Sequence, residues 1–292
     1  MKRLHFMMRN IAALMGYRGP ALALIFLTIV VLLAIFADVL GFDPFKQDII
    51  HALEGPSAKH WFGTDELGRD MLARVIHGAR TSLVTAGGAV TIAAVIGVPL
   101  GLIAGFFGGW RDGVIMRVID VMMALPGILF AMALIAVLGR GQIAALVAVG
   151  ISGVPTFARI VRAQVLTLRK RDYVTAVESF GGSSTYNMFN TVLPNSWPPI
   201  LVQIVVLSSV AILLEASLAF LGIGVPPPQP SWGEMLRAGK SFLHDSPTYA
   251  IVPGVVLTLT ILSFDTLGRG LQTVLENPRR SSAKPTTEGA AS

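Results

Sequence analysis

The 292-residue sequence contains no cysteine. Disulfide bonds and Cys-ligated metal sites are therefore excluded, and the absence fits any redox compartment without identifying one. The five histidines lack the spacing of zinc ligands, and no G-x-S-x-G segment marks a nucleophilic serine. The sequence therefore gives no support for metal-dependent or nucleophilic catalysis.

Charged residues are scarce, at 14% of the chain against 53% hydrophobic residues. A soluble globular domain carries more charge and less apolar content than this, so we predict an integral membrane protein. The net charge of +6 does not indicate nucleic-acid binding, because the basic residues lie mainly beside apolar runs. Orientation in a membrane explains that placement better.

A phosphate-binding loop is also missing. The segment GEMLRAGKS at 233–241 has one residue too many between its glycines for G-x-x-x-x-G-K-[ST], and no strand is expected before it. Any ATP that drives this protein must therefore be bound by another polypeptide.

Long apolar runs dominate what is present, and about 20 apolar residues cross a bilayer. A cleavable signal peptide is a poorer interpretation of the first run, which begins late, is long and lacks a small-x-small cleavage site. We predict an all-α fold with six transmembrane helices. The six charge-poor runs extend over 19–37, 82–110, 121–139, 141–158, 197–214 with continuation through 224, and 246–264.

The lysines and arginines orient these spans. With the N-terminus inside, 15 of the 23 fall in cytoplasmic segments, which is the bias that membrane insertion produces. We therefore predict a cytoplasmic segment over 1–18, a transmembrane domain over 19–280 and a disordered cytoplasmic tail over 281–292. Cysteines introduced at Asn10, Asn187 and Ser292 should be labelled from the cytoplasm, and those at Lys59 and Lys240 from outside.

The polar stretch 172–200, within a cytoplasmic loop over about 159–200, predicts a helix, a glycine hinge and a second helix. Gly181 and Gly182 should end the first helix. Ser183 and Ser184 can cap a second one through Asn190, which Leu193-Pro194 should break. The apolar positions at helical spacing are Tyr173, Ala176, Val177 and Phe180 in the first helix, and Tyr186, Met188, Phe189 and Val192 in the second.

This stretch resembles the loop of permease subunits of bacterial ABC importers, where Glu-Ala-Ala, three residues and Gly precede a Leu-Pro. Thr175 and Val177 stand where the family usually has Glu and Ala. The resemblance implies that the short helix docks into a groove on a separate ATPase subunit, whereas an ordinary amphipathic loop is the alternative. The residues it assigns to that contact are Asp172, Tyr173, Thr175, Ala176, Val177, Gly181, Tyr186, Phe189, Leu193 and Pro194.

The first outer loop carries a second motif, over about 60–80. Met71, Leu72, Val75 and Ile76 share one face, which predicts an amphipathic helix from Asp70 to Ala79 lying on the outer membrane surface and serving the entrance. The segment is closely similar to one in dipeptide and oligopeptide importer permeases. The shared residues include His60, Gly63, Thr64, Asp65, Gly68, Arg69, Asp70 and Arg74. Replacing Arg69 and Asp70 is expected to lower uptake unless the motif serves folding alone.

The resemblance covers 19–280 and identifies the chain as a C-type permease subunit of the peptide/nickel importer family. It implies a bacterial inner-membrane assembly with a second related permease, two ATPase subunits that hold ATP and magnesium, and an external solute-binding protein. No cofactor would bind this chain directly. The alternative is a secondary transporter driven by an ion gradient, which needs coupling-ion ligands within its spans and often carries inverted repeats.

Three acids fall within or beside the apolar runs, where an ionised carboxylate is costly and needs a partner. We predict local pairs of Asp120 with Arg117 and of Asp265 with Arg269, three and four residues away. Glu215 lies deeper, and the sequence leaves open whether it makes a structural hydrogen bond or lines the translocation path.

Overall fold

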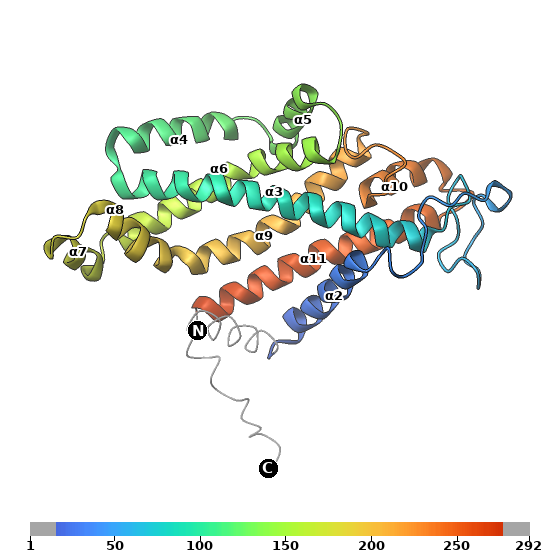
Figure 1. The fold of residues 1–292 in the computed structure, drawn as a ribbon, viewed down its shortest axis with the longest axis horizontal. Coiled ribbons are helices and arrows are strands. Elements are labelled where there is room, and N and C mark those ends of the chain that lie inside the picture. The colour runs from blue at the N-terminus through green and yellow to red at the C-terminus, as the bar shows by residue number, and fades with distance from the viewer. Residues whose placement is uncertain (1–15, 277–292) are drawn as a thin grey trace, which may run out of the picture.

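A computed structural model describes residues 16–276, which fold into helices, turns and loops without a strand (Figure 1). The long helices are α2 (Arg18–Ile35), α3 (Met71–Phe107), α4 (Gly109–Met123), α5 (Gly127–Leu138), α6 (Gln142–Leu168), α9 (Leu193–Phe220) and α11 (Thr248–Glu276). The short ones are η1 (Ile49–His51), α7 (Asp172–Ser179), α8 (Ser184–Asn187), the π-helical turn η2 (Met188–Val192), α10 (Trp232–Gly239) and η3 (Lys240–Phe242).

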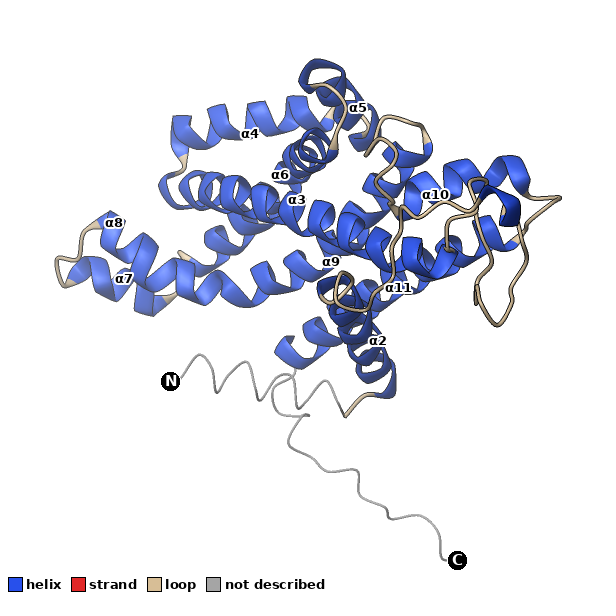
Figure 2. Cartoon of the chain, turned by 45° about the vertical axis from the view of Figure 1, so that its right-hand side comes forward, coloured by secondary structure: helices blue, strands red, loops and turns tan. Residues whose placement is uncertain are grey.

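Five helices among the described residues are long and apolar enough to cross a membrane, and six spans result if α4 and α5 count as one broken span. The prediction of an all-helical protein with six spans is confirmed in this form. The turn between α3 and α4 and the pair α7–α8 lie at one end of the molecule, whereas the loop over 36–70 and α10 lie at the other (Figures 1 and 2). The first end is the predicted cytoplasmic side.

The core of the bundle is the contact between α3 and α6, against which α9 packs. Gly97, Gly101 and Gly105 recur every fourth residue along α3, and a Cβ on each would come within 3 Å of α6 atoms. Small residues at this spacing let two membrane helices approach closely. Helices α2 and α11 pack together on the side of this core.

The third span is not the straight helix expected over 121–139. Helix α4 begins at Gly109, and α5 turns away from it by 91° after a break at residues 124–126. The sequence placed the start of this span too late because α4 carries Arg111, Asp112, Arg117 and Asp120, which interrupt the apolar signal. Pro126 lacks a backbone N–H and precedes the first residue of α5, so it marks the break.

The predicted surface helix from Asp70 to Ala79 is wrong as a separate element. These residues form the first turns of α3, whose 37 residues make it about 55 Å long, against about 30 Å of hydrocarbon. Its apolar face meets protein and not lipid, because Met71 and Val75 are buried with Met235 and Tyr249. The outer part of α3 therefore packs against α10 and the start of α11 within the same chain.

Leu193-Pro194 does not end the second short helix, contrary to expectation. Helix α8, the π-turn and α9 run without interruption from Ser184 to Phe220. Pro194 lies at the N-terminal end of α9, directly after the π-turn, whose wider hydrogen-bond spacing relaxes the demand for its missing N–H. The short helix is thus joined rigidly to the fifth span.

Side-chain burial changes the labelling test of topology. Asn187 is fully buried, so a cysteine there would be a poor reporter, whereas Thr185 is exposed two residues earlier. We expect Thr185→Cys to react with an impermeant maleimide only from the cytoplasmic side and Lys59→Cys only from outside. Reaction of Thr185→Cys in sealed right-side-out cells would contradict the orientation. The predicted segment 281–292, and with it Ser292, lies outside the described residues, as do Asn10 and most of 1–18.

Candidate functional site

The helix pair α7–α8 is built around one left-handed glycine. Gly181 has φ +82°, its N–H donates to the Glu178 carbonyl at 3.0 Å, and the Gly182 N–H donates to the Val177 carbonyl at 2.9 Å. This is the Schellman pattern, which ends a helix and fixes the direction of the chain that leaves it. Ser183 then caps α8 by accepting from the Tyr186 N–H. The predicted helix, glycine hinge and second helix are all present.

Asn187 holds the two short helices together, and the sequence analysis missed this role. Its side-chain amide donates to the Val174 carbonyl at 3.0 Å and to the Glu178 carboxylate at 3.4 Å, with its own side chain fully buried. The only hint in the sequence was the position of Asn187 next to the apolar Met188, which is buried in the same turn. The pair therefore behaves as one body rather than as two helices on a flexible loop.

Aromatic side chains of the pair point to solvent. Four of them are exposed, and the most exposed is Phe180 at 92%. Among the apolar positions at helical spacing, Met188 and Val192 are buried in the core of the bundle, and so is Val174, which lies outside that pattern. The exposed aromatics are Tyr173, Phe180, Tyr186 and Phe189. These exposed side chains lie on the helix pair at one end of the molecule (Figure 1).

The outer motif forms a buried charge network. Asp65 is fully buried, accepts from its neighbouring backbone N–H groups and receives the Arg69 Nε at 2.6 Å. Arg74 is also buried and lies between two carboxylates, with Nε 3.2 Å from Asp65 Oδ2 and Nη2 3.3 Å from Glu234 Oε2. Arg74 therefore joins the outer loop to α3 and α10, whereas Arg69 pairs with Asp65 and Glu66 within the loop.

The remaining residues of the motif shape the loop. Asp70 accepts from the Ala73 N–H and so caps α3, and His60 holds the same carboxylate at 2.7 Å. Thr64 is fully buried and accepts from the Glu54 N–H. Gly63 and Gly68 both have positive φ, and a Cβ on Gly68 would lie 1.8 Å from the Asp48 carbonyl oxygen. All eight predicted residues thus lie in one folded unit.

Glu234 gives this network a pH dependence. Burial raises the pKa of its carboxyl above the ordinary 4.5, and Glu66 adds to this, whereas Arg74, Arg69 and Arg237 act against it. A carboxyl whose pKa rises on folding binds its proton more tightly in the folded state. Its contribution to stability is therefore present below pH 4.5 and is lost as the pH rises through the folded pKa.

We expect Glu234→Gln to weaken this dependence. As the pH falls from 7 toward 4.5, the melting temperature of the wild-type protein should gain a contribution from protonation of Glu234 that the glutamine variant lacks. Thermal unfolding in detergent across this range measures it, and Glu54→Gln, on an exposed outer-loop residue, is the control. Parallel pH profiles for wild type and Glu234→Gln would contradict the expectation.

Glu215 is buried inside the subunit. It is 1% exposed. The hydroxyls of Ser82 and Ser231 lie near its carboxylate but do not hydrogen-bond to it. In this conformation its place is the junction of α3, α9 and the turn before α10. The geometry gives no support to a position on the translocation path.

The acids near the predicted cytoplasmic side pair across helices as well as within them. Asp120 bonds Arg159 of α6 at 2.6 Å, so the predicted pairing with Arg117 is wrong, whereas Asp265 pairs with Arg269 at 2.9 Å as expected. Asp112 also makes a two-pronged contact with Arg162. Within 16–276 no three His, Asp or Glu side chains cluster as metal ligands would.

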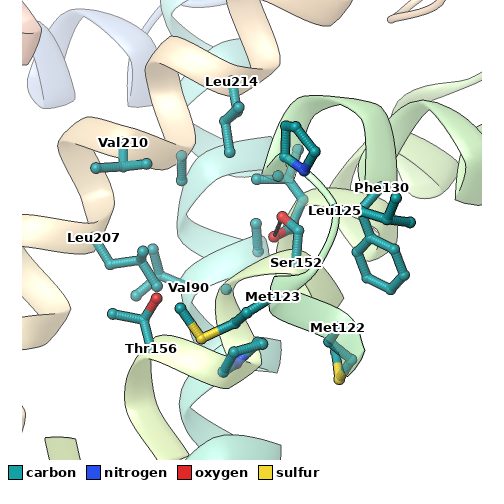
Figure 3. A pocket seen from close by; sticks show the side chains of 17 residues that line it. Val90, Met122, Met123, Leu125, Phe130, Ser152, Thr156, Leu207, Val210 and Leu214 are labelled. Atoms are coloured by element: carbon teal, nitrogen blue, oxygen red, sulfur yellow. Dashed lines mark hydrogen bonds between the residues drawn. The ribbon is translucent and has the colours of Figure 1, made fainter. Parts of the chain in front are cut away.

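A cavity of about 370 Å³ opens beside the break between α4 and α5 (Figure 3). Its lining is apolar apart from two hydroxyls, those of Ser152 and Thr156 on α6. Helix α3 contributes Ala89 and Val90, and α6 contributes the segment around Ser152 and Thr156. The rest of the lining comes from the end of α4, the break, the start of α5 and four residues of α9, which are Leu207, Val210, Ala211 and Leu214. No charged side chain lines it.

Sequence relatives of known name match most of the chain. It is 41% identical over 259 residues to the dipeptide transport system permease protein of Alkalihalophilus pseudofirmus, covering 88% of this chain and 85% of that one. It is 40% identical over 273 residues to the di/tripeptide transport system permease protein of Pseudomonas aeruginosa, covering 91% and 90%. It is 41% identical over 228 residues to the glutathione transport system permease protein of Pectobacterium atrosepticum, covering 78% and 76%.

The fold has solved counterparts. An inward-facing structure of the MetNI methionine ABC transporter superposes with a TM-score of 0.57 at 16% identity, covering 70% of this chain and 97% of that one. Residues 97–280 match the family described as binding-protein-dependent transport system inner membrane component. The predicted resemblance is thereby confirmed, and the chain is a multi-pass transport subunit and not an enzyme. The chain belongs to the family of inner-membrane components of binding-protein-dependent transport systems.

Proposed function

We propose that this chain is one of two related permease subunits through which an ATP-driven importer carries short peptides or peptide-like solutes. The observation that carries the proposal is about 40% identity over most of the chain to permeases named for dipeptides, di/tripeptides and glutathione. All three solutes are small peptides. A binding-protein-dependent system implies an ATPase and an external binding protein as partners.

The pair α7–α8 supports the proposed contact with an ATPase subunit. A motor outside the membrane moves the spans only through a rigid connection, and here α8 continues through the π-turn into α9. Asn187 and the glycine turn fix α7 to that same body. The exposed aromatics then offer apolar area to a groove on the partner, which is how a short helix is commonly recognised.

Reconstitution tests the proposal against a gradient-driven transporter. Proteoliposomes would contain this chain, its companion permease and both ATPase subunits. Binding protein and a labelled dipeptide would be added on the side of the membrane opposite the ATPase subunits. We expect uptake that requires ATP hydrolysis and persists when ion gradients are collapsed with ionophores. Uptake that follows an imposed ion gradient without ATP would support the secondary transporter instead.

A further inference from the structure

We infer that the cavity beside the α4–α5 break is a subsite on the translocation path that holds an apolar side chain of the passing peptide. The inference rests on the proposed function and names a part of the substrate that this subunit recognises. It starts from the depth of the cavity. Thr156 and Leu207, which line it, lie within a residue of the middle of α6 and α9. Substrate sites near the midplane beside discontinuous helices are typical of secondary transporters, and we infer the same placement for this subunit.

The surface around the break is incompatible with lipid. Residues 123–127 are all exposed, with Met123 at 46% and Leu125 at 50%, and the chain between α4 and α5 is not helical there. The first N–H groups of any α-helix have no intrahelical partner, and no side chain caps those of α5. Irregular backbone at membrane depth is tolerated only where protein covers it or where it lines a watery cavity.

This face of the subunit therefore turns toward the companion permease and the aqueous path between the two, not toward the bilayer. Met123, Leu125 and Val210 line the cavity and are also exposed at the surface of the subunit (Figure 3). An acyl chain is excluded as its occupant by the same argument. The occupant must pass along an aqueous path and also fill an apolar cavity. A peptide with a polar backbone and an apolar side chain meets both conditions.

The lining fits such a solute. A volume of 370 Å³ lies at the lower end of the range for small-molecule sites, about 300–1,000 Å³. The Ser152 hydroxyl donates to the Val149 carbonyl at 2.7 Å, whereas the Thr156 hydroxyl makes no hydrogen bond among the described residues. Thr156 can therefore bond a peptide group while the apolar wall takes the side chain. A charged side chain would lose its water there without gaining a partner.

Two dipeptides of different side chain test the subsite in the reconstituted four-subunit complex with binding protein. Val210→Trp fills the mouth of the cavity from α9, and Met123→Trp fills it from α4. Leu213→Trp is the matched control, because Leu213 is exposed on the same helix three residues away and does not line the cavity. The measured quantity is the initial rate of ATP-driven import of Leu-Leu divided by that of Gly-Gly.

We expect each cavity-filling variant to lower this ratio about tenfold relative to wild type, the size of effect that side-chain fit in an apolar pocket produces. Leu213→Trp should keep the wild-type ratio. Equal loss of both peptides in Val210→Trp and Met123→Trp would overturn the subsite and indicate packing against the companion permease, and an unchanged ratio would overturn it too. Wild-type complex that imports neither peptide would instead count against the proposed function.

Discussion

Gly181→Val should remove most ATP-driven uptake while the protein still inserts into the membrane. Gly181 has φ +82°, a conformation that costs an L-residue about 1–2 kcal/mol and a β-branched residue more. No atom lies within 4 Å of a Cβ built there, so the effect comes from backbone conformation and not from a clash. The turn must change, and Phe180 and Tyr186 then lose their relative placement. We expect uptake to fall about tenfold or more, since about 1.4 kcal/mol corresponds to a factor of ten.

The control is Gly181→Asn, because asparagine adopts the left-handed conformation more readily than other residues with a side chain. Its uptake should stay close to wild type, as should that of Thr175→Glu, whose position is exposed. Copurification of the ATPase subunit separates lost docking from lost coupling. Wild-type uptake by Gly181→Val would remove the pair α7–α8 from the transmission path.

The sequence predicted those elements whose signal is local. Five spans follow apolar runs, and the glycine turn follows from the succession Gly181, Gly182 and Ser183. The third span was misplaced because the two acids of α4, Asp120 and Asp112, pair with Arg159 and Arg162, which lie 39 and 50 residues further along the chain. A pairing at that separation leaves no trace in hydrophobic periodicity. The same holds for Asn187, whose partner is a backbone carbonyl on another helix.

The outer motif shows a different limit of sequence reasoning. Its residues were identified correctly, but their apolar neighbours were assigned to a membrane surface. Amphipathic periodicity indicates that one face of a helix is shielded from water, but it does not distinguish lipid from protein as the cover. Here Trp232, Met235 and Tyr249 cover it, all fully buried and more than 150 residues away from Met71. The cavity could not be predicted from the sequence either, because it exists only where five helices and the break between two of them meet.

Arg74→Met should destabilise the outer unit more than any single surface change. Arg74 is 1% exposed, contacts Asp65 and Glu234, and its Nη1 donates to the Pro44 carbonyl at 3.4 Å. Removing one partner of a buried ion pair leaves an uncompensated buried charge and costs about 3–5 kcal/mol. For a domain of this size that corresponds to a melting temperature lower by roughly 10 °C. Thermal unfolding of the purified protein in detergent measures the change.

Two further variants make the expectation specific to the network. Arg159→Met breaks the pair with Asp120, whose two side chains are about half exposed, and such pairs contribute about 0–1 kcal/mol. Adding Glu234→Gln to Arg74→Met neutralises one of the carboxyls that has lost its partner, so the double variant should melt above Arg74→Met alone. If instead Arg74→Met and Arg159→Met melt at the same temperature, burial of the network contributes nothing, and the outer motif must be retained for contact with another protein.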